Sequence, residues 1–285
     1  MAERIIEDGG IVFGVSFDER WNAVYTHTAS REGLAAYRGS KYVQASVGHA
    51  YIEVQGFLKE GRKVLFAGTA CQVAGLRRFL RKDYPNLFLV EVLCHGVPSP
   101  KVWQRYLGTK CREFDGGAIT GINFRDKRDG WYQYAVTISF EHGRVYSVSH
   151  KKDPYFRGFM KNMYLRPSCY ACKCKRGRSG SDIVIADYWG IGKVLPGYAD
   201  NRGTSLVLIN TEKGQSLFAS IASGMDSVET PYAKCLQKNG GFAEHLRVPI
   251  DRGIFFKHLN ADTSGDVFCY RPTLLERIKA LMDAL

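Results

Sequence analysis

The sequence lacks a secretion signal and has no long apolar run. No apolar core segment follows residues 1–4, and no uninterrupted apolar stretch approaches the about 20 residues that a membrane-spanning helix needs. These two absences predict a cytoplasmic protein without a membrane span. Internal repeats and low-complexity segments are also absent, which argues against repeat architectures and disordered tracts.

Acidic residues are scarce relative to basic ones. The 285 residues include 28 Asp and Glu against 40 Lys and Arg, so the formal net charge is +12. This excess predicts an anionic partner, and nucleic acid, a phosphorylated cofactor, an acidic substrate and an anionic iron-sulfur cluster all fit it. A merely basic surface is the alternative that charge alone leaves open.

Cysteine, in contrast, is well represented. The chain has eight cysteines and no secretion signal, so thiols or metal ligands are expected rather than a disulfide framework. A hydrophobic content of 45% in a chain of this length provides for a core of ordinary size.

A strand, a helix and a strand are predicted near the middle of the first half of the chain. Residues 63–67 and 87–93 are short apolar runs typical of strands buried on both faces. Between them, apolar residues recur at helical spacing at Val73, Leu76, Phe79 and Leu80. Such a unit places its strands parallel, so both carboxyl ends lie at the same edge of the sheet.

Each of these two strands is followed by a cysteine. Cys71 comes at the start of the helix and Cys94 directly after the second strand. If the strands are neighbours, their backbones lie about 4.8 Å apart, which one metal centre can bridge. Two buried and inert core cysteines are the alternative that this pair alone leaves open.

The remaining pattern predicts an α/β (α+β) fold with a mixed sheet around this parallel unit. Alternating residues at 118–125, 132–140 and 145–149 indicate an inserted antiparallel sheet. From Pro231 onward the pattern is mostly helical and ends in a helix over 272–285. We therefore expect a catalytic domain over 1–214, with inserted strands at 117–150, and a helical C-terminal region over 215–285 packed on it.

A second cysteine motif lies further along the chain. Cys169 and Cys172 form a C-x-x-C, whose two-residue spacer lets both thiolates bind one metal centre, with two further ligands coming from elsewhere. Cys174 is a fifth candidate for a metal ligand. A zinc ribbon normally has a second pair at similarly short spacing, which Cys71 and Cys94 do not have, so the spacing favours iron-sulfur over zinc.

Two other stretches suggest a bound ligand. The small, basic stretch at 38–46 is of the kind that can wrap a phosphate with backbone amides, a hydroxyl and a lysine, although a solvated loop is the simpler interpretation. The predicted strand 181–187 ends in Asp187, and the aromatic and glycine residues after it can line a flat ring system or serve as core and turn.

Six segments in order resemble the coenzyme F-420 hydrogenase/dehydrogenase beta-subunit family: GSKYVQ, LFAGTACQVAGL, LCHGVPSPKVW, NFRDKRDGW, RPSCYAC and SDIVIADYWGIG. The resemblance covers residues 10 to about 214. It implies a protein that binds FAD and a 4Fe-4S cluster and passes electrons between iron-sulfur centres and a flavin, which reduces or oxidises an organic substrate.

The resemblance also implies site residues. The cluster ligands fall on Cys71, Cys94, Cys169 and Cys172. The implied FAD contacts and neighbours of the cluster are Ser40, Lys41, Tyr42, Gln44, Gly68, Thr69, Gln72, His95, Asn123, Arg125, Lys127 and Asp187.

The expected function is therefore that of an FAD-dependent iron-sulfur oxidoreductase, acting on a small anionic substrate such as an F-420-type deazaflavin or a polysaccharide-pathway compound. The ferredoxin-like region that many relatives carry at their amino end is missing, so we expect a ferredoxin or ferredoxin-like subunit as partner, and no nucleic acid. The alternative is a basic module that is stabilised by zinc bound to the same cysteines and that binds nucleic acid without catalysis.

Overall fold

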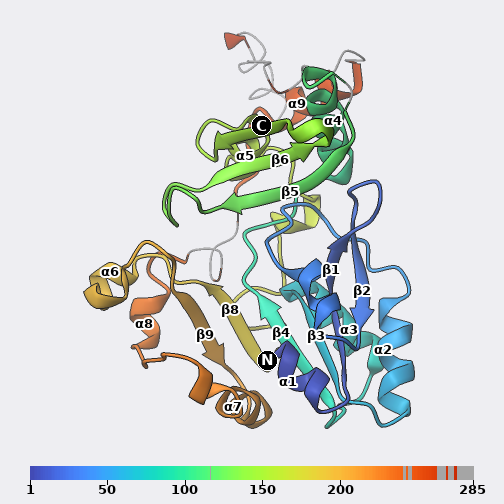
Figure 1. The fold of residues 1–285 in the computed structure, drawn as a ribbon, viewed down its shortest axis with the longest axis vertical. Helices are drawn as coiled ribbons and strands as arrows, with labels where there is room; N and C mark the ends of the chain where they lie inside the picture. The colour runs from blue at the N-terminus through green and yellow to red at the C-terminus, as the bar shows by residue number, and fades with distance from the viewer. Residues whose placement is uncertain (116, 240–241, 243–245, 262–267, 269–272, 275–285) are drawn as a thin grey trace. The chain divides into compact units, whose positions relative to one another are not determined.

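The computed structural model describes residues 1–115, 117–239, 242, 246–261, 268 and 273–274 (Figure 1). The helix predicted over 272–285 lies outside the described residues apart from 273–274. The chain divides into two compact units. The first comprises Met1–Arg38, Ala45–His95 and Cys172–Glu244, and the second comprises Gly39–Gln44, Gly96–Ala171 and His245–Leu285. The predicted domain boundary at residue 214 stays a prediction.

The first unit is built on a six-stranded mixed sheet of order β2-β1-β3-β4-β8-β9. Its strands are β1 (Ile11–Phe17), β2 (Ala23–Thr28), β3 (Val64–Thr69), β4 (Leu87–Val92), β8 (Ile183–Asp187) and β9 (Ser205–Ile209). The four central strands β1, β3, β4 and β8 are parallel, and the edge strands β2 and β9 are antiparallel to their neighbours. The predicted α/β class and parallel strand-helix-strand unit are confirmed.

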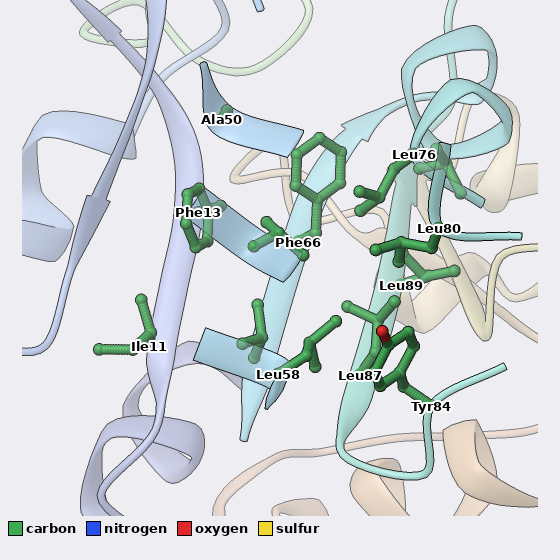
Figure 2. Packing of buried hydrophobic residues seen from close by; sticks show 13 residues of the cluster. Ile11, Phe13, Ala50, Leu58, Phe66, Leu76, Leu80, Tyr84, Leu87 and Leu89 are labelled. Carbon is green, nitrogen blue, oxygen red and sulfur yellow. The ribbon is translucent and has the colours of Figure 1, made fainter. Parts of the chain in front are cut away.

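Helices cover this sheet because its central strands are apolar on both faces. The α-helices of the first unit are α1 (Ala2–Glu7), α2 (Ala50–Lys59), α3 (Ala70–Leu80), α6 (Ile191–Val194), α7 (Glu212–Ala219) and α8 (Tyr232–Cys235). Short 3-10 helices are η1 (Glu32–Tyr37), η4 (Pro196–Tyr198) and η5 (Ala222–Gly224). On one face, Phe66 and Leu89 of neighbouring strands pack with Leu58 of α2 and Leu76 of α3 (Figure 2). On the other, Leu65 and Val90 pack with Ile5 of α1 and Leu217 of α7.

One apolar residue of α3, Phe79, lies at the surface. Phe79 fits the apolar spacing of α3, yet its side chain is 40% exposed and contacts Tyr51 at the surface, with ring centroids 5.9 Å apart. Ala70 and Ala74 are buried in its place. The buried stripe of α3 is therefore rotated toward the small residues at its start.

The second unit holds a three-stranded antiparallel sheet of order β5-β6-β7, as predicted. Its strands are β5 (Ile119–Asp126), β6 (Ala135–Phe140) and β7 (Val145–Ser149), and its helices are α4 (Pro100–Glu113), α5 (Pro154–Met160), α9 (Arg252–Ala261), η2 (Glu141–Gly143) and η3 (Pro167–Cys169). The core is aromatic: Trp103 of α4 lies 5.1 Å by ring centroid from both Phe124 and Tyr155.

A buried carboxylate joins the elements of this second unit. Asp153 caps α5 by accepting a hydrogen bond from the Phe156 backbone N at 2.6 Å. It also accepts from the hydroxyls of Tyr106, at 2.6 Å, and Tyr146, at 2.9 Å. Burial raises the pKa of Asp153, and the three donors oppose that rise. Among the described residues, no helix is both long and apolar enough to cross a membrane.

Candidate functional site

Cys71 and Cys94 follow neighbouring strands at the carboxyl edge of the large sheet. Strands β3 and β4 pair in parallel with Thr69 opposite Val92, and each cysteine lies two residues beyond its member of that pair. Neighbouring strands lie about 4.8 Å apart, so the two thiols follow adjacent strand ends. The next strand, β8, pairs Ile185 with Val92 and ends at Asp187 on the same edge. Crevices at such edges are where open α/β sheets bind ligands.

A compact hydrogen-bond network orients the first turn of α3, which carries Cys71. The Gln72 Oε1 accepts from the Thr69 backbone N at 3.0 Å and from the Thr69 Oγ1 at 2.9 Å. This is the reciprocal half of a capping box. Tyr25 donates its hydroxyl to the same Oε1 at 3.0 Å. The Thr69 Oγ1 lies 3.4 Å from the Cys71 Sγ, so these residues fix the direction of the thiol.

Gly68 has a steric role in the same network. A Cβ at this position would collide with the Tyr25 hydroxyl, whose oxygen lies 3.1 Å from the Ala67 carbonyl oxygen. Gly68, Thr69 and Gln72 thus already serve to position Cys71. Their predicted contact with a cofactor stays a prediction.

The cysteine-rich loop, residues 172–180, lies against α3, because a Cβ at Gly180 would collide with the Arg77 side chain. Burial raises the pKa of the Cys174 thiol, and the negative charges of Cys172 and Cys71 raise it further, while Arg78 lowers it. Cys71 is exposed, and Cys94 and Cys172 are partly exposed, so a group from outside the core can reach them.

Glu91 ties this loop to the sheet, and the sequence reasoning missed it. The side chain is 3% exposed on β4. Its Oε2 accepts hydrogen bonds from the Ser179 hydroxyl and, at 3.3 Å, from the Ser181 hydroxyl. Burial raises the pKa of Glu91, and both serines oppose that rise. The signal available in the sequence was a single charge inside the apolar run 87–93.

The candidate donors at this edge are thiols, the groups that hold iron-sulfur clusters. Within the described part of the chain, no three His, Cys, Asp or Glu side chains are close enough together to hold a metal ion. A 4Fe-4S cluster makes a different demand, because it is held by four thiolates, each binding its own iron. Accessible cysteines at one edge fit that chemistry. Cys169 belongs to the second unit, so the predicted set of four draws on both units and stays a prediction.

In the second unit, Tyr42 and Arg125 come together. The Arg125 Nη1 donates to the Tyr42 hydroxyl at 3.4 Å, and its guanidinium lies over the Tyr134 ring at 4.2 Å. Tyr42 itself is packed by aromatic rings and accepts a hydrogen bond from the Tyr155 hydroxyl at 2.7 Å through its carbonyl. The Asn123 side chain accepts from the Arg125 backbone N at 2.9 Å.

The other predicted cofactor contacts vary in their surroundings. Burial lowers the pKa of Lys41 to about 8, and its ammonium donates to the Gly39 carbonyl at 3.3 Å. Ser40 and Lys127 are exposed, whereas His95 and Asp187 in the first unit are partly exposed. Gln44 donates its backbone N to the Pro98 carbonyl at 2.9 Å.

Known proteins with a similar sequence or structure support the assignment of the fold. Residues 61–232, more than half of the chain, match the family model that describes the C-terminal part of the coenzyme F420 hydrogenase/dehydrogenase beta subunit. A chain of the F420-reducing NiFe hydrogenase complex from Methanosarcina barkeri is similar in structure, with 19% identity and a TM-score of 0.50. The alignment covers 77% of this chain and 70% of that one, and at this identity it shows the fold alone. No curated protein matches the sequence.

Proposed function

Because this chain belongs to the coenzyme F420 hydrogenase/dehydrogenase beta-subunit family, a family of oxidoreductases, we propose that it is an iron-sulfur flavoprotein. It relays electrons between a 4Fe-4S cluster and FAD, which reduces or oxidises an organic substrate. The observation that carries this proposal is the register of β3 and β4, which sets Cys71 and Cys94 at adjacent strand ends.

The cluster is held by Cys71, Cys94, Cys169 and Cys172. When bound, a cluster of this type transfers single electrons. The protein's contribution is to fix its ligands: Thr69 and Gln72 hold the turn that carries Cys71. Nearby basic side chains of the 172–178 segment offset the negative charge of four thiolates.

FAD is held through its phosphates by the 40–44 segment and by Arg125. The Lys41 ammonium and the Arg125 guanidinium supply positive charge, and Ser40 supplies a hydroxyl. Packing of Arg125 on Tyr134 and its bond to Tyr42 pre-organise the guanidinium for a phosphate oxygen. A flavin accepts one or two electrons and so couples single-electron transfer to hydride exchange with a substrate.

The substrate is a small anion, such as an F420-type deazaflavin or a polysaccharide-pathway compound, in keeping with the charge of +12. A ferredoxin or ferredoxin-like subunit supplies or removes electrons. Attraction between an acidic carrier and this basic chain would speed their encounter.

The absorption spectrum of anaerobically purified protein tests this function. We expect flavin bands together with a broad iron-sulfur shoulder, and both FAD and iron on chemical analysis. Zinc in place of iron, with no flavin, would contradict the proposal. That result would favour a zinc-stapled basic module that binds nucleic acid.

A further inference from the structure

We propose that a basic face formed by α3 and the cysteine-rich loop is the docking surface for a small acidic electron-carrier protein. This inference rests on the proposed function and adds where the carrier binds. The α3 basic face is defined by these exposed residues: Arg77, Arg78, Arg81, Lys82, Lys173, Arg176 and Arg178.

Two segments far apart in the sequence form this face. Gly180 approaches α3 so closely that a Cβ there would collide with the Arg77 guanidinium. The Glu91 bonds to Ser179 and Ser181 hold the loop in place. All these residues belong to the first unit, so the face is one surface within that unit.

The charge of this face is of one sign. Residues 70–82 and 172–180 contain eight Lys and Arg and no Asp or Glu. Arg77 pairs with Asp83 at 3.4 Å, but the Asp83 side chain is 94% exposed. An exposed pair of this kind contributes little, so the Arg77 guanidinium remains available to a partner.

The face adjoins the thiols through which electrons would pass. Cys71 is exposed at the start of α3, and Arg78 lies seven residues further along the same helix. With a rise of 1.5 Å per residue, that separation is about 10 Å along the helix axis. A carrier bound to the α3 basic face would therefore sit beside Cys71.

An acidic protein fits this face better than single-stranded nucleic acid. Nucleic-acid sites of that type combine positive charge with aromatic side chains on which bases stack. The exposed aromatic residue of α3 is Phe79, whose ring instead packs against Tyr51. Among the described residues of this face, positive charge without an available aromatic stacking platform suits electrostatic steering of an acidic protein.

A charge-reversal experiment tests the proposal. The double variant Arg77→Glu/Arg78→Glu reverses charge on the face. The matched control Lys59→Glu/Lys193→Glu makes the same change in net charge at exposed positions on α2 and α6. Each loaded protein is mixed anaerobically with a reduced, acidic bacterial ferredoxin across a salt series, and in parallel with dithionite, a small reductant that needs no protein docking.

We expect the wild-type rate with ferredoxin to fall as salt rises. The Arg77→Glu/Arg78→Glu rate at low salt should be lower by about tenfold or more, because steering contributes on the order of 10 to 1,000-fold. Its dithionite rate should be unchanged, and the control should stay within about twofold of wild type for both reductants.

Equal ferredoxin rates for the wild type and the face variant would overturn the docking proposal while leaving the proposed function intact. A wild-type protein that ferredoxin does not reduce, but that binds a single-stranded RNA oligonucleotide through the same arginines, would also overturn it. A protein that takes up neither cluster nor FAD on reconstitution would overturn the proposed function, and the docking proposal with it.

Discussion

The two units of this protein are built on different sheets and supply different chemistry. The first has parallel central strands buried on both faces, and the side chains proposed as cluster ligands there include the thiols that follow β3 and β4. The second has an antiparallel sheet and an aromatic core, and its candidate residues are Lys41, Tyr42 and Arg125. Two of the proposed thiol ligands, Cys71 and Cys94, therefore follow strand ends, whereas the proposed phosphate contacts come from a loop and a strand stabilised by aromatic packing.

The largest effect that we predict is loss of the cluster when a thiol of the first unit is replaced. Cys71→Ser and Cys94→Ser should each abolish iron binding, because a neutral hydroxyl is a poor substitute for a thiolate. Iron and sulfide analysis after anaerobic reconstitution measures the result. Cys111→Ser, on α4 of the second unit, is the matched control and should retain full iron. Retained iron in both edge variants would disprove a ligand role for the strand-end thiols.

Much of the first unit could be predicted, because its signals are local. The apolar runs at β3 and β4 and the helical spacing between them define a parallel unit, so the placement of Cys71 and Cys94 follows from topology. Phe79 fits the helical spacing of the apolar residues, yet its side chain is 40% exposed. The spacing of apolar residues alone does not show which side of the helix is buried, because small residues such as Ala74 can also pack against the sheet.

Contacts between distant segments could not be predicted in the same way. Glu91 is bonded to serines about 90 residues later in the chain, and no periodic pattern links them. The approach of Gly180 to Arg77 is likewise a tertiary contact. In the second unit the antiparallel strands were evident from alternation, but the stacking of Arg125 on Tyr134 depends on the register of β5 and β6.

Truncation of the first unit's core should have the next largest effect. Leu76 is fully buried on α3, so Leu76→Ala should lower the free energy of unfolding by about 2–5 kcal/mol. Phe79→Ala, on the same helix, should cost less because its side chain is 40% exposed. Denaturant titration of both variants measures the difference. A larger loss for Phe79→Ala would contradict the observed rotation of the helix.

Removal of the buried carboxylate should have a smaller effect. Glu91→Ala leaves the Ser179 and Ser181 hydroxyls without their acceptor, at a cost of about 1–3 kcal/mol, whereas Glu91→Gln keeps a carbonyl acceptor. The raised pKa of Glu91 means that the folded state binds its proton more tightly than the unfolded state does. Stability should therefore fall as the pH rises through that raised pKa.

The Glu91→Gln variant separates the hydrogen bonds that this side chain accepts from the pH dependence that its ionisation causes. It should lose that fall in stability with pH and should be more stable than Glu91→Ala at neutral pH. Thermal unfolding of the apoprotein from pH 4 to 8 measures both. If Gln and Ala variants are equally unstable and show the wild-type pH dependence, Glu91 does not hold the loop as described.

The smallest predicted effect is a pH dependence in the second unit. The lowered pKa of Lys41, about 8, means that its ammonium is charged below that pH. Affinity for FAD should be constant below pH 8 and should fall above it, by at most about tenfold per pH unit, until the pKa of the bound state is reached. Lys41→Arg stays charged and should bind FAD without that fall. Fluorescence titration with FAD measures it, and identical profiles for the two proteins would exclude a phosphate role for Lys41.

The most direct test of the central claim is electron paramagnetic resonance of the reduced protein, combined with iron and FAD analysis. We expect four irons and one FAD per chain, and a signal of a reduced 4Fe-4S cluster that is absent in Cys71→Ser and present in Cys111→Ser. A signal that persists in Cys71→Ser, or a reduced protein with FAD but no iron signal, would contradict a cluster built on the strand-end thiols.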